Sequence, residues 1–289
     1  MHARIAVLVA SSLIALAGTA QAAPRGRHVK VTLVAETDSI RPGQTLVAGL
    51  RLQMDAGWHT YWRNPGDAGL PTKAKWSLPE GFVAGELQWP RPIRFNTGPL
   101  VSYGYEHEVL LPVEIQVPAT LSSNEVRLSA RVSWLECEEV CLPGKAKLAL
   151  DLPVRANLGP GPAAALFKKT RAQLPEENSA WSVSAASGEG SIALTMQPPQ
   201  GTTLQEAYFY PLTRRAIDYS KPQALQPFGQ GYRLELSRHP RGKTVEHLEG
   251  VLVGRTEQGT VALEVDVPIT SKTAGDRGIV KGLDSPGSR

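Results

Sequence analysis

Hydrophobic and polar residues alternate with a period of two along most of this chain, which is the pattern of half-buried β-strands. Between residues 127 and 134 every even-numbered position is apolar and every odd-numbered position is polar. The same alternation returns in residues 146–154. Further strands are predicted at residues 28–36, 45–54 and 109–117 and around Trp76. The first half of the chain is therefore expected to be a stack of short strands.

A breaker then interrupts this rhythm. The run Gly159-Pro160-Gly161-Pro162 disfavours regular structure, and residues 163–174 after it have the composition of a short helix. Beyond the helix the strand pattern resumes, with strands expected at 181–196, 206–210, 231–237 and 245–253 and in the closing segment "TVALEVDVPI".

The composition agrees with an all-β protein. The 289 residues include 23 Pro and 27 Gly, so turns are frequent and long helices are disfavoured. We predict two immunoglobulin-like β-sandwich domains joined by a linker with one short helix. The expected parts are a signal peptide at 1–22, a domain carrying both cysteines at 23–155, the linker at 156–175, a second, smaller β-sandwich at 176–270, and a disordered tail at 271–289.

The first 22 residues have the features of a signal peptide. A short basic start is followed by an apolar run at 5–18 and by Ala20-Gln21-Ala22, the small-x-small pattern of a cleavage site. Cleavage near Ala22 predicts export to the periplasm, an oxidising compartment. The alternative is an uncleaved membrane anchor, although the run is shorter than a spanning helix requires. After cleavage no direct membrane insertion is expected.

The charge balance excludes one class of partner. The chain has 31 Lys and Arg against 27 Asp and Glu, a net charge of +4 that is spread along the sequence without a block of one sign. Nucleic acid is therefore not an expected partner.

The chain has two cysteines, Cys137 and Cys141, in the stretch "SWLECEEVCLPGKAK" between two predicted strands. Three interpretations follow. As a structural staple the pair would be weak, because closing a five-residue loop stabilises by about 2 kcal/mol, whereas a link across a sandwich contributes about 4 kcal/mol.

A metal clip is the second interpretation. Two nearby thiolates can bind a soft ion such as Cu(I), but the three Met include the initiator and the six His are scattered along the chain. A zinc site would need a second pair of ligands. We therefore predict neither a metal nor an organic cofactor.

Redox exchange is the third interpretation. A disulfide in a turn between strands is exposed and easily reached, as exchanging disulfides are. Glu136, Glu138 and Glu139 place negative charge around the pair. We expect these three carboxylates to tune the reduction potential and the choice of partner.

The same residues resemble a known family. "WLECEEVCLPG", "GWHTYWRNPGDAGLPTKAKWSLPEGF" and "SYGYEHEVLLPV" resemble the periplasmic N-terminal domain of DsbD-type thiol:disulfide interchange proteins, closest to the suppressor-of-copper-sensitivity B subgroup. "YFYPLTRRAIDYSKPQAL" and "GVLVGRTEQGTVALEVDVPI" resemble the second sandwich of that subgroup.

The resemblance implies a function of the protein-disulfide reductase type. Electrons would come from a separate membrane electron-transfer protein, because the membrane domain of full-length members is not found in this sequence. They would pass to periplasmic thioredoxin-fold proteins through Cys137 and Cys141. By the family's habit Cys141 forms the mixed disulfide, although the residues alone do not rank the two. The alternative function is a periplasmic copper-handling or adaptor module whose cysteine pair is structural or binds a soft metal.

Members of this family also cover the pair with an aromatic cap. In this chain Phe95 and Tyr103 are the cap candidates, with packing at a sheet edge as the alternative. For Trp58, Tyr61 and Trp62 we expect packing instead of a binding groove. For His59 and His107 we expect a solvent-facing or core position instead of one beside the cysteines.

Overall fold

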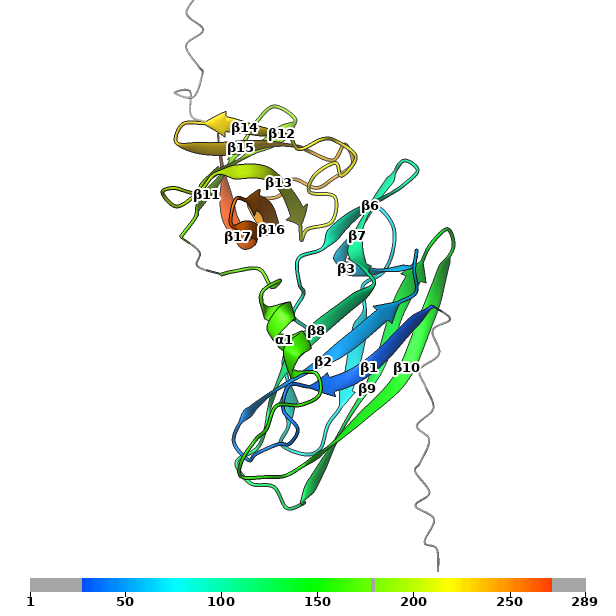
Figure 1. Ribbon diagram of the computed structural model, residues 1–289. Helices are drawn as coiled ribbons and strands as arrows, with labels where there is room; N and C mark the ends of the chain where they lie inside the picture. Colours follow the sequence, from blue (N-terminus) through cyan, green and yellow to red (C-terminus); the bar gives the residue numbers. More distant parts are fainter. Residues whose placement is uncertain (1–27, 178–179, 272–289) are drawn as a thin grey trace, which may run out of the picture.

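The computed structural model describes residues 28–177 and 180–271 (Figure 1). Within these ranges the chain forms seventeen strands and one helix, which confirms the all-β prediction. No helix in the described part is both long and apolar enough to cross a membrane. The predicted signal peptide, and the predicted tail after Ser271, lie outside the described residues.

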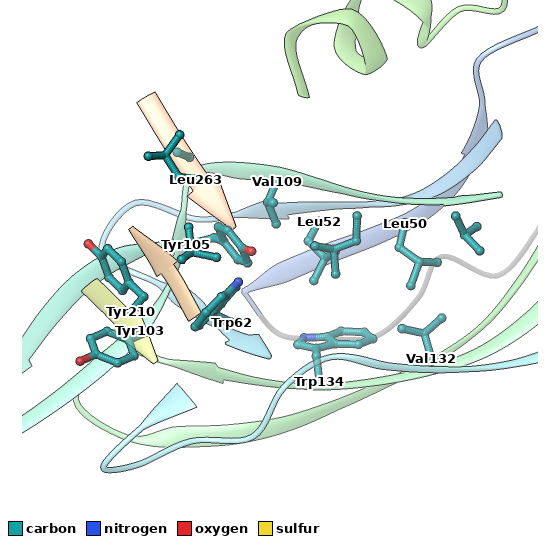
Figure 2. Packing of buried hydrophobic residues seen from close by; sticks show 14 of the residues in the cluster. Leu50, Leu52, Trp62, Tyr103, Tyr105, Val109, Val132, Trp134, Tyr210 and Leu263 are labelled. Carbon is teal, nitrogen blue, oxygen red and sulfur yellow. The ribbon is translucent and has the colours of Figure 1, made fainter. Parts of the chain in front are cut away.

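Residues 29–153 form two sheets that face each other. One sheet has the order β1 (Val29–Ala35), β2 (Thr45–Met54), β8 (Glu108–Gln116) and β5 (Val83–Ala84). The other has the order β10 (Cys141–Pro153), β9 (Glu125–Cys137), β3 (His59–Gly66), β7 (Leu100–Glu106) and β6 (Ile93–Thr97), with β4 (Lys73–Ser77) also paired to β9. Leu50 and Leu52 of β2 lie opposite Val132 and Trp134 of β9 in the buried core (Figure 2).

The strands β9 and β10 form one long antiparallel hairpin. Their register runs without interruption from Cys137 opposite Cys141 to Glu125 opposite Pro153. The even-numbered positions 126–134 of β9 are buried, as the alternation predicts. Both strands are longer than predicted, so the cysteines are the end residues of the strands and the connection consists of residues 138–140.

The helix α1 (Ala164–Arg171) is attached to the first domain, the name used below for the two sheets of residues 29–153. Its Phe167 is fully buried and its Arg171 forms an ion pair with Glu36. Ahead of the helix, Gly161 donates its backbone N–H to the carbonyl of Glu36 at 2.7 Å. The helix is shorter than the predicted 163–174, and the segment that precedes it is held against β1.

The remaining strands, called the second domain below, form a seven-stranded sheet. Its order is β13 (Leu204–Pro211), β16 (His247–Thr256), β17 (Gly259–Ser271), β11 (Ser182–Ser187), β12 (Ser191–Gln197), β15 (Gly231–Ser237) and β14 (Leu225–Phe228). The long strand β17 joins its two halves, because it pairs with β16 and then, at its end, with β11. The predicted single strand 181–196 is a hairpin of β11 and β12. It turns at Gly188-Glu189-Gly190, where Gly190 has a φ of +70° that favours glycine.

Candidate functional site

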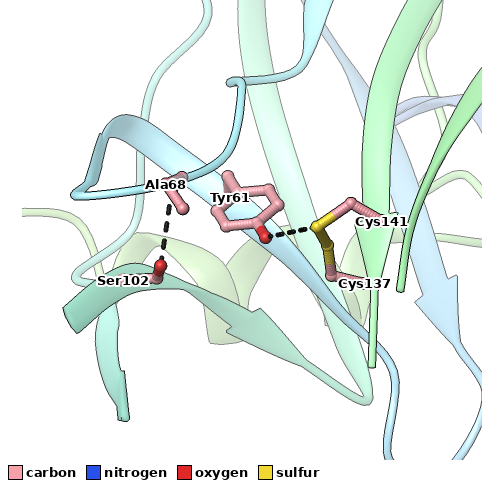
Figure 3. Close-up of a disulfide and its surroundings, with 5 residues drawn as sticks. All are labelled: Tyr61, Ala68, Ser102, Cys137 and Cys141. Atoms are coloured by element: carbon pink, nitrogen blue, oxygen red, sulfur yellow. Dashed lines mark hydrogen bonds between the residues drawn. A yellow bond between two sulfur atoms is a disulfide. The ribbon is translucent and has the colours of Figure 1, made fainter. Parts of the chain in front are cut away.

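Cys137 and Cys141 form a disulfide at the turn end of the β9–β10 hairpin (Figure 3). They are direct partners in the antiparallel register, with their Cα atoms 4.2 Å apart. Side chains of opposed residues lie on the same face of a sheet, so the hairpin itself brings the two sulfurs together.

The two halves of the disulfide differ in exposure. Cys137 is 2% exposed, whereas Cys141 is an exposed residue. Disulfide exchange requires a thiolate to approach a sulfur atom directly. The structure therefore offers the Cys141 side of the bond to a visiting protein and protects the Cys137 side.

Tyr61 contacts the exposed half of the disulfide. Its hydroxyl lies 3.4 Å from the Sγ of Cys141 (Figure 3). Burial raises the pKa of Tyr61, so the hydroxyl stays protonated and can donate to sulfur. The Tyr61 ring packs directly against Gly69. A side chain at position 69 would not fit, because its Cβ would lie 2.2 Å from the Tyr61 ring.

His59 lies beside the buried half. It is the Cα partner of Cys137 in the pairing of β3 with β9. Its ring packs edge-on against Tyr61 at 5.2 Å and stacks on Phe95 at 4.5 Å between centroids. Burial lowers the pKa of His59, so the imidazole is neutral at neutral pH. His59 is a core histidine, as expected, but it is also a neighbour of the cysteines, which was not expected.

The two cap candidates lie in different places. Phe95 reaches the site through its stacking on His59. Tyr103 instead points toward the second domain, where its hydroxyl lies 3.1 Å from that of Tyr208 and its ring packs against Tyr210 and Tyr219. None of the contacts found for Tyr103 in the described residues reaches the disulfide, so its assignment as a cap is not supported.

The three carboxylates near the pair also differ. Glu136 is buried and accepts hydrogen bonds from the Trp134 indole N–H at 2.9 Å and from the His28 backbone N–H at 3.2 Å. Glu138 and Glu139 are exposed on the turn. Redox tuning by these three residues stays a prediction. In the described part of the chain no group of three or more His, Cys, Asp or Glu side chains has the arrangement of a metal site.

Exposed apolar side chains lie on the segments around the disulfide. Val140, directly before Cys141, is 66% exposed, and Leu70, directly after Gly69, is 58% exposed. Ile93 and Leu100, on the hairpin that carries Phe95, are also exposed. Exposed apolar residues next to a reactive group favour the docking of another protein.

The sequence alone does not show how close His59 and Tyr61 lie to the disulfide. The strand β3 that carries them is buried at every position except Arg63, so it has no alternation that would separate one face from the other. The signal available in the sequence was the aromatic density of "GWHTYW".

Part of the chain is similar to known proteins. Residues 29–153 match the family model "Thiol:disulfide interchange protein DsbD, N-terminal". Comparison with curated protein sequences gives no match. Among solved structures, the N-terminal periplasmic domain of ScsB from Proteus mirabilis is 21% identical and superposes with a TM-score of 0.62, covering 84% of this chain and 95% of that chain. The periplasmic chaperone SfaE is 14% identical with a TM-score of 0.22, covering 84% of this chain and 100% of that chain.

Proposed function

We propose that this protein relays electrons in the periplasm, because residues 29–153 match the family model "Thiol:disulfide interchange protein DsbD, N-terminal". It would accept them from a separate membrane reductase and pass them to thioredoxin-fold proteins. The observation that carries this proposal is the disulfide with one buried residue, Cys137, and one exposed residue, Cys141.

The exchange begins at the exposed sulfur. A thiolate of the reducing partner attacks the Sγ of Cys141, the Cys141–Cys137 bond breaks, and Cys137 leaves as a thiolate. In the mixed disulfide the partner's first cysteine is bonded to Cys141. The partner's second cysteine, as a thiolate, then attacks the sulfur of that first cysteine and releases Cys141 as a thiolate. The partner's dithiol has lost two electrons and two protons, and Cys137 and Cys141 have gained them. Reaction with an oxidised thioredoxin-fold protein runs the same steps in reverse.

Two neighbouring side chains support these steps. The Tyr61 hydroxyl, 3.4 Å from the Cys141 sulfur, can donate a hydrogen bond to that sulfur when it leaves as a thiolate. In the reverse direction the neutral His59, whose backbone pairs with that of Cys137, can accept the proton that the Cys137 thiol loses. No other cofactor is needed, since the two sulfurs carry the electrons.

Single cysteine variants test the relay. Cys137→Ser leaves Cys141 free, and we expect it to hold a thioredoxin-fold protein or a membrane reductase as a mixed disulfide in the periplasm. Such adducts appear as bands that reductant abolishes on a non-reducing gel, and mass spectrometry identifies them. Cys141→Ser should trap far less, because Cys137 is buried.

The double variant Cys137→Ser/Cys141→Ser is the matched control and should trap nothing. The relay proposal fails if neither single variant holds a thioredoxin-fold protein or a membrane reductase. Stoichiometric Cu(I) uptake by the reduced protein, without any mixed disulfide, would instead support the copper-handling alternative.

A further inference from the structure

Two strands of the first domain, β3 and β6, each contribute side chains to both the disulfide site and the second domain. On β3, His59 and Tyr61 face the site, whereas Trp62 and Asn64 contact the second domain. The hairpin of β6 and β7 lies next to the second domain as well (Figure 1). The aromatic cover, defined here as Phe95, His59 and Tyr61, contacts the disulfide through Tyr61, and the strands that carry it also contact the second domain.

The contacts behind β3 are buried and specific. Asn64 donates its side-chain N–H to the carbonyl of Pro211 at 2.7 Å and lies 3.3 Å from the hydroxyl of Tyr219. The Trp62 ring packs edge-on against Tyr210, with 6.2 Å between centroids (Figure 2). These contacts fix the half of β3 that follows Tyr61.

Both strands of the β6–β7 hairpin contact Tyr208, and the Tyr103 ring also packs against Tyr210 and Tyr219. The guanidinium of Arg94 lies 5.6 Å from the centroid of the Tyr208 ring, and the hydroxyl of Tyr103 lies 3.1 Å from the Tyr208 hydroxyl. Arg94 and Tyr103 are direct partners across the hairpin. Tyr208 thus holds both strands of the hairpin at the same level, one residue away from Phe95.

The hairpin needs this support because β6 is an edge strand. It is five residues long and its only neighbour in the sheet is β7. A short edge strand with one partner is among the elements that open most easily. Within the first domain, the contact found for the Phe95 ring is the stacking on His59.

We propose that the second domain positions the aromatic cover beside the disulfide, and that Tyr208 is the positioning residue that limits access to the disulfide from the side of the β6–β7 hairpin. The functional meaning of this control rests on the exchange function proposed above. The second domain then sets how often the hairpin opens, and so how fast a reductant reaches the disulfide from that side.

The rate of reduction by dithiothreitol tests this directly on the full oxidised protein. One thiolate of dithiothreitol attacks the disulfide, its second thiol closes the cyclic product, and two electrons and two protons pass to Cys137 and Cys141. Tyr208→Ala removes the Arg94 contact and the Tyr103 hydroxyl contact while Tyr103 keeps its other ring contacts in the second domain, so we expect reduction to be about three- to tenfold faster. Tyr208→Phe removes only the hydroxyl contact and should give a smaller increase.

A double-mutant cycle shows whether Tyr208 acts through the cover. Phe95→Ala should accelerate reduction by itself, and Tyr208→Ala should add little in the Phe95→Ala background, because the same opening is already achieved. Multiplicative effects of the two changes would overturn the proposal.

Tyr232→Ala is the matched control. Tyr232 also lies in the second domain, but its hydroxyl accepts a hydrogen bond from the Leu204 backbone within that domain. It should lower the thermal stability without changing the reduction rate. The positioning role is refuted if the disulfide of Tyr208→Ala is reduced at the wild-type rate. It is also refuted if Tyr232→Ala accelerates reduction as much as Tyr208→Ala does. A small reductant needs no protein partner, so this result is independent of the trapping experiment.

Discussion

Cys137 and Cys141 have the same side chain but differ in their exposure to solvent. The residue at the end of β9 is enclosed by its neighbours, including His59, while the residue at the start of β10 faces solvent next to Tyr61 and Val140. An asymmetric disulfide of this kind directs attack to one sulfur and leaves the other as the leaving group.

His59 links the site to pH. Because burial lowers its pKa, the folded protein holds this ring without a proton at pH values where the unfolded chain, with a pKa near 6.5, already binds one. Its contribution to stability is therefore complete above about pH 6.5 and is lost as the pH falls toward the lower folded pKa. The sign follows from the unfolded state binding more protons in that window.

We predict that His59→Asn weakens this dependence. The free energy of unfolding of the wild type should fall between about pH 7.5 and about pH 5.5, and that of the variant should fall less. Urea denaturation of the oxidised proteins at each pH measures the difference, since every other ionisable group is common to both. Parallel pH profiles for the two proteins would contradict the assignment.

The β9–β10 hairpin and the helix α1 are stabilised in different ways. The hairpin follows from an alternation that is explicit in the sequence, and its register carries the cysteines together. The helix is only eight residues long and has Phe167 and Thr170 as its buried residues. A helix this short is not stable alone, so docking on the first domain holds it in place.

The variant Phe167→Ala should therefore destabilise the protein by about 3 to 5 kcal/mol, the cost of removing a large buried side chain. Denaturant unfolding followed by circular dichroism measures the loss. Lys168→Ala, an exposed neighbour on the same helix, is the control and should change stability by less than about 0.5 kcal/mol. An equal effect of the two substitutions would show that α1 does not depend on Phe167.

The two domains form a continuous structure in which buried polar groups meet across the interface. Asn64 is 2% exposed and binds the second domain through Pro211 and Tyr219 while its side-chain oxygen accepts the backbone N–H of Gly66. A buried group with this many partners is expensive to remove, because its partners are left without hydrogen bonds.

We predict that Asn64→Ala costs about 1 to 3 kcal/mol and loosens the coupling of the domains. Differential scanning calorimetry should show a lower and broader transition than that of the wild type. Asn124→Ala, which changes an exposed residue distant in sequence from the interface residues, should leave the profile unchanged. A wild-type transition for Asn64→Ala would mean that Asn64 does not couple the two domains.

Much of the fold could be predicted because β-strands expose one face and bury the other. Residues 45–54 were predicted as a strand and are β2, and the segments around the cysteines were identified by the same alternation. The errors occurred where that rule fails. The predicted strand 181–196 contains a glycine turn, and β3 is buried on both faces.

The order of residues along the chain was sufficient to establish the all-β class and to single out the cysteine pair, because alternation and spacing are local properties. Packing decided the rest: which cysteine is exposed, that His59 lies beside the pair, and that Tyr103 faces the second domain instead of the disulfide. These features depend on residues more than 70 positions apart in the chain that meet only when the sheets assemble. A local sequence pattern cannot predict these contacts, because they join residues on different strands and not neighbours along one strand.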